Sequence, residues 1–299
     1  MKRARIKQID AFTSVPFGGN PAQVLTEAAR LSEDEMKKIA GESGFETAFV
    51  QKASQNKSPF KIRFFAPMGE LKFAGHLTIA AFHALSEEAK FFLSEPLTKM
   101  TQETKAGHLN VEIHSARGQI QKIMIELPKP AFLEKADPEE IARVLEIESD
   151  EMDKTPPQVV EVGSAHLMVP VKNRRIIENL KPDLYALSEI NQRMGAVSTH
   201  VFAPDAVSPI AMVHGRNFAP AIGIHESAAS GAANGALGAF LINSRMIRGN
   251  SPITFIAEQG HSLGRPCEIN VEVHFKETDV TLVRIGGQAV TIMEGEVFL

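Results

Sequence analysis

The chain has 299 residues, 43% of them hydrophobic and 23% charged, which predicts a folded globular protein of two domains because single domains usually hold roughly 100 to 200 residues. A net charge of −4 with scattered Lys and Arg argues against a nucleic-acid partner, and no apolar run reaches the ~18 residues of a membrane span. A single cysteine, Cys267, excludes an intramolecular disulfide, and with no signal-peptide pattern at the start we expect a cytoplasmic location.

The first half alternates predicted strands with two helices. Residues 5–12 alternate apolar and polar side chains, as a half-buried strand does. Ser32, with Glu35 three residues on, forms a capping-box pattern that predicts a helix to about Gly41. Strands are predicted from Thr47 and over 60–66. A helix that is apolar on nearly every face is predicted over 77–85, and two further strands are predicted within 109–127.

The second half repeats this order. A helix is predicted near 137–146, one strand over 160–171, a helix near 181–194, two strands before residue 220, an apolar helix from about 230, and four closing strands. The pentapeptide Arg-x-Phe-Ala-Pro occurs at 63–67 and again at 216–220, each time shortly before the apolar helix. This shared order predicts an internal duplication and an α+β fold of two similar domains, each a curved sheet wrapped around one apolar helix.

The first residues of two helices and one carboxylate are the candidates for substrate binding and catalysis. Gly75–His76 and Ser230–Gly231 begin the two apolar helices, and free N–H groups at a helix start bind carboxylates, although both could be ordinary buried starts. Glu46 lies between a helix and a strand, where partial burial should raise its pKa towards neutrality and suit it as a general base. Alternatively, Glu46 is an ordinary solvent-exposed loop residue without a catalytic role. Glu42, four residues earlier, is the competing candidate for the general base.

His76 could orient a substrate or share a proton with Glu46, or it could simply cap its helix. The ten histidines show no spacing typical of a metal site, and neither a Gly-x-Gly-x-x-Gly nor a Walker pattern is present. We therefore expect no metal and no nucleotide cofactor. The glycines of the stretch 230–241 are interpreted as sites of close helix packing.

The sequence resembles the PhzF-like family of phenazine biosynthesis, which has the diaminopimelate epimerase fold. The resemblance covers nearly the whole chain and is carried by six strings: FGGNPAQVL at 17–25, IAGESGFETAFV at 39–50, RFFAPMGELKFAGH at 63–76, RNFAP at 216–220, SGAANGALGAFL at 230–241 and the closing VRIGGQAVTIMEGEVFL.

This resemblance implies two pseudo-symmetric domains, each a mixed β-barrel-like sheet around a central helix, with the active site in the cleft between them and no cofactor. We place the domains at 1–127, completed by about 288–299, and at 128–287. It further implies that Glu46 is the acid/base that moves a proton on a small carboxylic acid, that His76 helps to hold the substrate, and that the chain forms a homodimer. Substrate contacts are implied for Asn20, Gly75, Ser227, Ser230 and Gly231.

The second loop departs from the family pattern. Where the family reads Glu-Asp-Pro-Ala-Thr-Gly-Ser, this chain has Ser227 in place of the aspartate and Ala232 in place of the last serine. A different substrate is the simplest expectation. His225 and Glu226 are candidates for the vacated role, although we favour a hydrated loop as the explanation for these two residues. The leading hypothesis is a cofactor-independent isomerase; the alternative is a carboxylate-binding protein that kept the fold and lost turnover.

Overall fold

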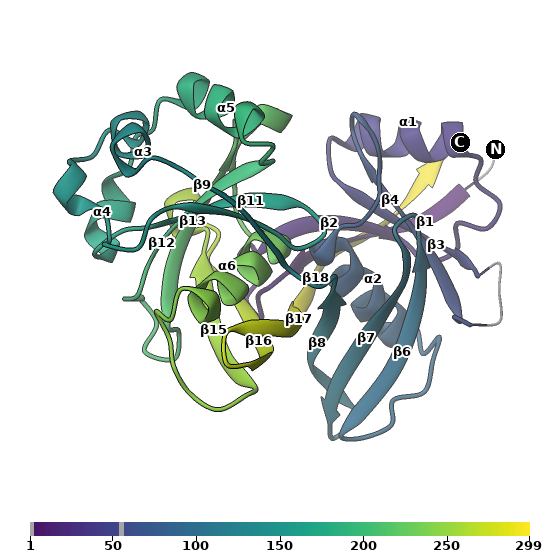
Figure 1. Cartoon of the computed structure of the whole chain (residues 1–299). Coiled ribbons are helices and arrows are strands. Elements are labelled where there is room, and N and C mark those ends of the chain that lie inside the picture. Colours follow the sequence, from purple (N-terminus) through teal and green to yellow (C-terminus); the bar gives the residue numbers. More distant parts are fainter. Residues whose placement is uncertain (1–2, 54–56) are drawn as a thin grey trace. The chain divides into compact units, whose positions relative to one another are not determined.

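The computed structural model describes residues 3–53 and 57–299, which divide into two compact units. Unit 1 holds the described residues up to Glu126 together with Gly286–Leu299, and unit 2 is Leu127–Ile285. Both units have an α+β arrangement in which few helices accompany a sheet of parallel and antiparallel strands (Figure 1). None of the helices in the described ranges has the length and apolar character that crossing a membrane requires.

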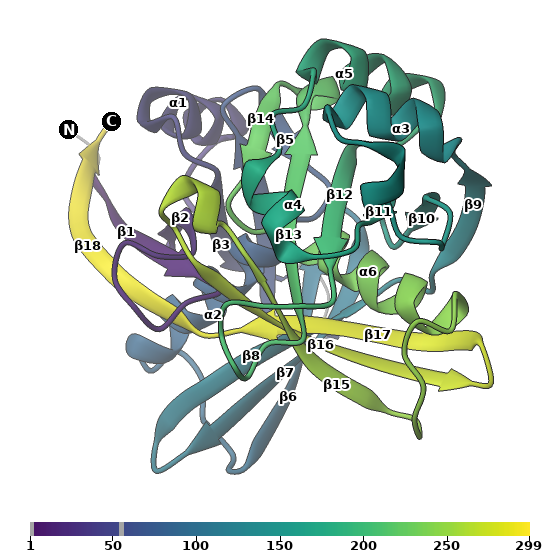
Figure 2. The ribbon, with the colours of Figure 1, turned by 90° about the vertical axis from the view of Figure 1, so that its left-hand side faces the viewer.

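Unit 1 contains the following elements: β1 (Arg3–Ala11), β2 (Asn20–Leu25), α1 (Glu33–Ser43), β3 (Thr47–Lys52), β4 (Phe60–Ala66), β5 (Gly69–Leu71), α2 (Gly75–Glu87), β6 (Leu97–Thr104), β7 (Gly107–Ala116), β8 (Gln119–Leu127) and β18 (Ala289–Phe298). Ser32 caps α1 through the predicted capping box with Glu35. Strand β1 pairs antiparallel with both β2 and β18, so the last strand of the chain lies beside the first (Figure 2).

Unit 2 contains β9 (Ala131–Lys135), α3 (Pro138–Leu145), η1 (Ser149–Glu151), β10 (Gln158–Glu161), β11 (Ala165–Pro170), α4 (Arg174–Asn179), α5 (Leu184–Arg193), β12 (Ser198–Ala203), β13 (Val213–Ala219), η2 (Pro220–Ile222), β14 (Ile224–Ser227), α6 (Gly231–Asn243), β15 (Ile253–Gln259), η3 (His261–Leu263), β16 (Cys267–Lys276) and β17 (Asp279–Gly287).

The two units repeat one order of strand pairing. In unit 1, β1 pairs antiparallel with β2, β2 pairs parallel with β3, and β3 pairs antiparallel with β4. Strand β4 then pairs antiparallel with β5 and parallel with β6. In unit 2, β10 to β13 pair in the same sequence of directions, and β13 pairs antiparallel with β14 and parallel with β15. Residues 67–74 then lead from β4 to the buried helix α2, and residues 220–230 lead from β13 to the buried helix α6. The predicted duplication is therefore present in the topology.

Each unit has one long helix buried on nearly all faces. In unit 1, α2 contacts β1, β2 and β3, and in unit 2, α6 contacts β10, β11 and β12, which are the equivalent strands. Close packing of α6 depends on glycine, because a Cβ on Gly238 would lie 2.7 Å from Val271 and 2.8 Å from Val273. The predicted packing role is confirmed for Gly238.

The repeated pentapeptide forms the same cluster in both units. Arg63 on β4 lies 5.0 Å above the ring of Phe65 and donates from Nε to Glu70 on β5 at 2.7 Å. On β13, the guanidinium of Arg216 lies 4.8 Å above the ring of Phe218 and donates from Nε to Glu226 at 2.9 Å. Both phenylalanines belong to apolar cores of their own units. The motif thus joins a core aromatic ring to an ion pair that fixes the returning strand before the buried helix.

Candidate functional site

Glu46 and His76 meet in unit 1. His76 lies in the first turn of α2 and donates from Nε2 to the Oε2 atom of Glu46 at 2.8 Å. The Glu46 side chain is 29% exposed and that of His76 is 12% exposed, so the pair is largely shielded yet reachable from solvent. Glu42, by contrast, is exposed on α1. The geometry therefore distinguishes the two competing glutamates in favour of Glu46.

The backbone around Glu46 is fixed by the sequence on both sides. Helix α1 ends because Gly44 adopts a left-handed conformation, with φ 71°, and its N–H returns to the carbonyl of Ala40. Two residues later, the Glu46 carbonyl accepts a hydrogen bond from Gln23 N–H on β2 at 3.0 Å, and β3 begins at Thr47. The carboxylate is thus presented by a short turn that is anchored at each end.

The expected rise in the Glu46 pKa is wrong. Burial is the largest influence and raises the pKa, but the hydrogen bond from His76 and the attraction of its charge together outweigh it. The pKa of Glu46 is consequently lowered below its ordinary value. The carboxylate is ionised at neutral pH, which is the state that accepts a proton.

The start of α2 leaves hydrogen-bond donors available next to this pair. Its N-cap residue, Ala74, makes no capping side-chain hydrogen bond, so the amides of Gly75 and His76 receive no oxygen from it. Free amides and the positive end of the helix dipole favour an anionic group at this position. A carboxylate ligand placed there would lie beside Glu46 and His76.

The second predicted set lies in unit 2, at the start of α6. Ser230 is the N-cap of α6, and its hydroxyl accepts from Ala233 N–H at 3.3 Å, whereas Ser227 donates its hydroxyl to the Ala229 carbonyl at 3.1 Å. Gly231 is the first helical residue. Unlike the start of α2, this helix start is capped by its own side chain. Both serine hydroxyls therefore already hold the loop in shape.

Gln259 is a residue of this loop that sequence reasoning missed. It is fully buried at the end of β15, donates to the Ser227 carbonyl at 2.6 Å and accepts from Ser230 N–H at 3.4 Å. It also accepts from the side chain of Asn234 at 3.0 Å. A glutamine 29 residues beyond Ser230 carries no local signal, because only the pairing of β15 brings it to the loop.

The hydrated-loop interpretation of Glu226 is wrong. Its carboxylate, 10% exposed, is held by both Nε and Nη2 of Arg216, and it also accepts from the Ser262 hydroxyl. A carboxylate engaged in this way cannot take over the role of the absent aspartate without giving up its ion pair. His225 is exposed.

The structure thus brings Glu46, Gly75 and His76 together, and separately brings together Ser227, Ser230 and Gly231. Asn20 begins β2 opposite Ala11 and is partly exposed. That the two sets serve one substrate stays a prediction.

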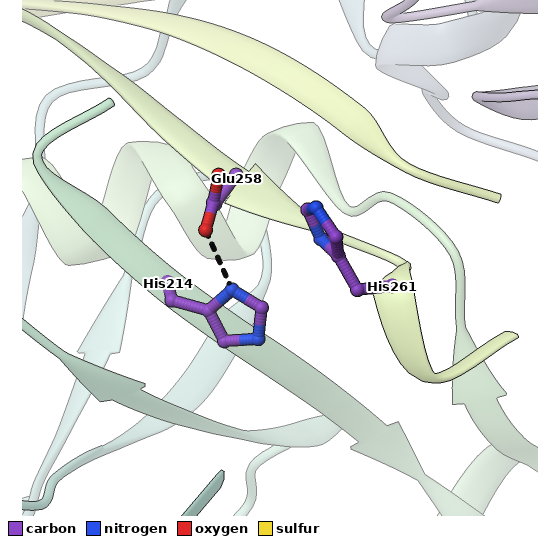
Figure 3. A group of neighbouring side chains, drawn as sticks. All are labelled: His214, Glu258 and His261. Atoms are coloured by element: carbon purple, nitrogen blue, oxygen red, sulfur yellow. Dashed lines mark hydrogen bonds and ion pairs between the residues drawn. The ribbon is translucent and has the colours of Figure 1, made fainter. Parts of the chain in front are cut away.

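A group of potential metal ligands in unit 2 was also missed by the sequence analysis. His214 on β13, Glu258 on β15 and His261 on η3 present ligand atoms that all lie within 4.8 Å of one another (Figure 3). Spacing along the chain gave no indication of this group, because 44 residues separate His214 from Glu258. Parallel pairing of β13 with β15, with His214 opposite Glu258, creates it.

Comparison with known proteins adds to this geometry. The family described as "Phenazine biosynthesis-like protein" matches residues 9–295. The chain is 34% identical to an uncharacterized isomerase of Clostridium acetobutylicum over 100% of this chain and 99% of that protein. It is 30% identical to the trans-2,3-dihydro-3-hydroxyanthranilate isomerase of Pseudomonas chlororaphis, covering 97% and 98% of the two chains.

Solved structures show the same fold. A PhzF-family protein of Bacillus anthracis matches with a TM-score of 0.89 and 29% identity, covering 100% of both chains. A hydroxyproline epimerase of Agrobacterium vitis matches with a TM-score of 0.68 at 12% identity, covering 99% of this chain and 92% of the other, which is a likeness of fold alone. The chain therefore has the fold shared by these isomerases and epimerases.

Proposed function

This chain belongs to the phenazine biosynthesis-like (PhzF) family, whose named relatives include isomerases, and we propose that it is itself an isomerase that moves a proton on a small carboxylic acid by means of Glu46. The observation that carries the proposal is the 2.8 Å contact between Glu46 and His76 at a helix start without a capping side chain. It supports the proposal because a carboxylate that can accept a proton lies next to the first turn of α2, where an imidazole and backbone amides can donate hydrogen bonds.

The proposed reaction balances without an added reactant. The Glu46 carboxylate removes a proton from a carbon next to an electron-withdrawing group, and the electron pair of the broken C–H bond delocalises into the substrate. The protonated Glu46 side chain then returns the proton to a different carbon of the substrate. This step leaves the substrate isomerised and Glu46 ionised again. His76 would donate a hydrogen bond to a substrate oxygen, and the α2 amides would hold the substrate carboxylate.

The sequence of the second loop, residues 226–232, indicates a substrate different from that of the named relative. In place of the family aspartate, Ser227 offers a hydroxyl that is already bonded to Ala229, and Ala232 offers no polar group. A pocket that has lost a carboxylate binds ligands with a different set of donors. We infer a substrate other than dihydro-hydroxyanthranilate, and the homodimer and cytoplasmic location remain proposals.

The altered loop also favours a second candidate, a carboxylate-binding protein without turnover. One experiment separates the two. The protein is screened by ligand-observed NMR against small cyclic and amino carboxylic acids, and each ligand that binds is then incubated with it in deuterated water. The isomerase predicts deuterium at a carbon of at least one bound acid, whereas binding without deuterium in any of them supports the second candidate and contradicts the first.

A further inference from the structure

His214, Glu258 and His261 converge in unit 2 from two neighbouring strands and the short helix that follows the second (Figure 3). The side chains of His214 and Glu258 are only 2% and 1% exposed, and His261 is partly buried. The two imidazole rings lie 5.1 Å apart between centroids and are tilted by 50°. Nothing in the proposed proton transfer uses these residues.

Glu258 is a buried carboxylate with directed partners. It accepts from the Nδ1–H of His214 at 2.8 Å and from the backbone N–H groups of Val207 and Ser208, the latter at 3.0 Å. A carboxylate has about four lone-pair sites, so three accepted hydrogen bonds leave one site for a further partner. A cation is the partner that a buried negative group favours most.

His261 provides an independent sign that this group has another partner. Its Nδ1 atom is buried and has no hydrogen-bond partner among the described residues. Leaving a buried polar atom unpaired is unfavourable, so such an atom in a folded protein requires an explanation. An imidazole nitrogen with a free lone pair is a common metal ligand.

We propose that His214, Glu258 and His261 bind one divalent transition-metal ion of the Zn²⁺ class. Two imidazole nitrogens and one carboxylate oxygen form a ligand set that Zn²⁺ accepts, with a remaining position for water, and that Mg²⁺ and Ca²⁺, which prefer oxygen ligands, do not. Atoms bound to one tetrahedral Zn²⁺ are about 3.4 Å apart, and the three candidate ligand atoms lie within 4.8 Å of one another, so side-chain rotation would bring them into this arrangement. Nδ1 is the ring nitrogen of His214 that faces Glu258 (Figure 3). The ion would therefore take the place of the Nδ1 proton and of its hydrogen bond to Glu258, and the proton of the neutral ring would be on Nε2.

The position of the ion gives it a role. Glu258 directly precedes Gln259, which holds Ser227 and Ser230 at the start of α6. A metal bound to Glu258 and His261 would hold β15 and η3 on either side of Gln259. The ion would therefore stabilise the loop Ser227–Ser230 by fixing the position of Gln259, and it would take no part in the chemistry at Glu46.

The test is metal binding to the full chain after removal of bound ions with a chelator. We expect one equivalent of Zn²⁺ by calorimetry and, with Co²⁺ as a spectroscopic probe, visible absorption bands typical of bound nitrogen ligands. His261→Ala should weaken Zn²⁺ binding about 100-fold or more, whereas His225→Ala, which removes an exposed imidazole of the same unit, should not change it. Wild-type protein that binds no ion, or binds it as tightly as His261→Ala does, would overturn the site.

Two further measurements keep the proposal testable if His261→Ala folds poorly. Glu258→Gln keeps the shape of the side chain, and it should also weaken Zn²⁺ binding. In the wild type, Zn²⁺ should raise the Tm, since a ligand that binds only the folded state stabilises it, and should slow amide hydrogen exchange over Ser227–Ser230. Tight Zn²⁺ binding with unchanged exchange there would overturn the role of the ion in holding the loop.

Discussion

The contact between Glu46 and His76 sets the protonation state on which the proposed chemistry depends. The sequence located both residues through the strings that carry them, but it gave the wrong direction for the Glu46 pKa. Burial does raise that pKa, as expected, and the expectation failed because the opposing hydrogen bond joins residues 30 positions apart, which no local pattern reveals. Glu226 was misread for the same reason, since its partner Arg216 lies on another strand.

Replacing His76 should reverse the shift. In His76→Asn the electrostatic attraction and the Nε2 hydrogen bond that lower the Glu46 pKa are lost while burial remains, so the Glu46 pKa should rise above its ordinary value. The measurement is a pH titration of ¹³C-labelled glutamate carboxyl groups by NMR, with the Glu46 signal assigned by its absence in Glu46→Gln. A Glu46 pKa that stays low in His76→Asn would show that another group holds it down.

At the scale of elements, helices with strong end signals were predictable and short elements were not. The capping box at Ser32 and the all-round apolar pattern of residues 77–85 located α1 and α2 correctly. The single strand expected over 160–171 is instead two antiparallel strands, β10 and β11, because the chain turns back at Gly163, which has φ 80°. Helix α4, six residues long, was not predicted, since it is too short to show a period.

A matched pair of glycine substitutions tests how α6 is packed. Gly238→Ala should lower the free energy of unfolding by about 1 to 3 kcal/mol, because its Cβ would overlap Val271 and Val273 on β16. In Gly41→Ala on α1, where a Cβ would meet nothing within 4 Å, the better helix propensity of alanine should raise it by about 0.5 to 1 kcal/mol. Urea unfolding measures both, and equal effects of the two substitutions would contradict the packing role.

At the scale of the whole molecule, the repeated pentapeptide revealed the duplication because each copy serves the same structural purpose. The order of strand pairing itself could not be predicted from the sequence, since parallel partners such as β4 and β6 are separated along the chain by β5 and α2. The chain returns to unit 1 at its end: β18 pairs with β1 from Arg3 to Ala11, and Val297 and Leu299 pack against the apolar cluster beside α1.

Unit 1 should accordingly depend on the last strand. Deleting residues 289–299 removes one of the two antiparallel partners of β1 and uncovers part of that apolar cluster. Hydrogen exchange followed by mass spectrometry should show lost protection in β1 and α1, with the amides of α6 in unit 2 still protected. Unchanged protection of β1 in the shortened chain would contradict this dependence.

The central claim, that Glu46 shuttles the proton, is tested most directly by comparing two glutamate variants. Glu46→Gln keeps the size of the side chain and removes the basic group, and Glu42→Gln makes the same change on the exposed face of α1, four residues earlier. With a bound carboxylic acid that the wild type labels in deuterated water, the rate of deuterium incorporation at carbon should fall by about 100-fold or more in Glu46→Gln and stay at the wild-type rate in Glu42→Gln. Equal rates in wild type and Glu46→Gln would contradict the claim.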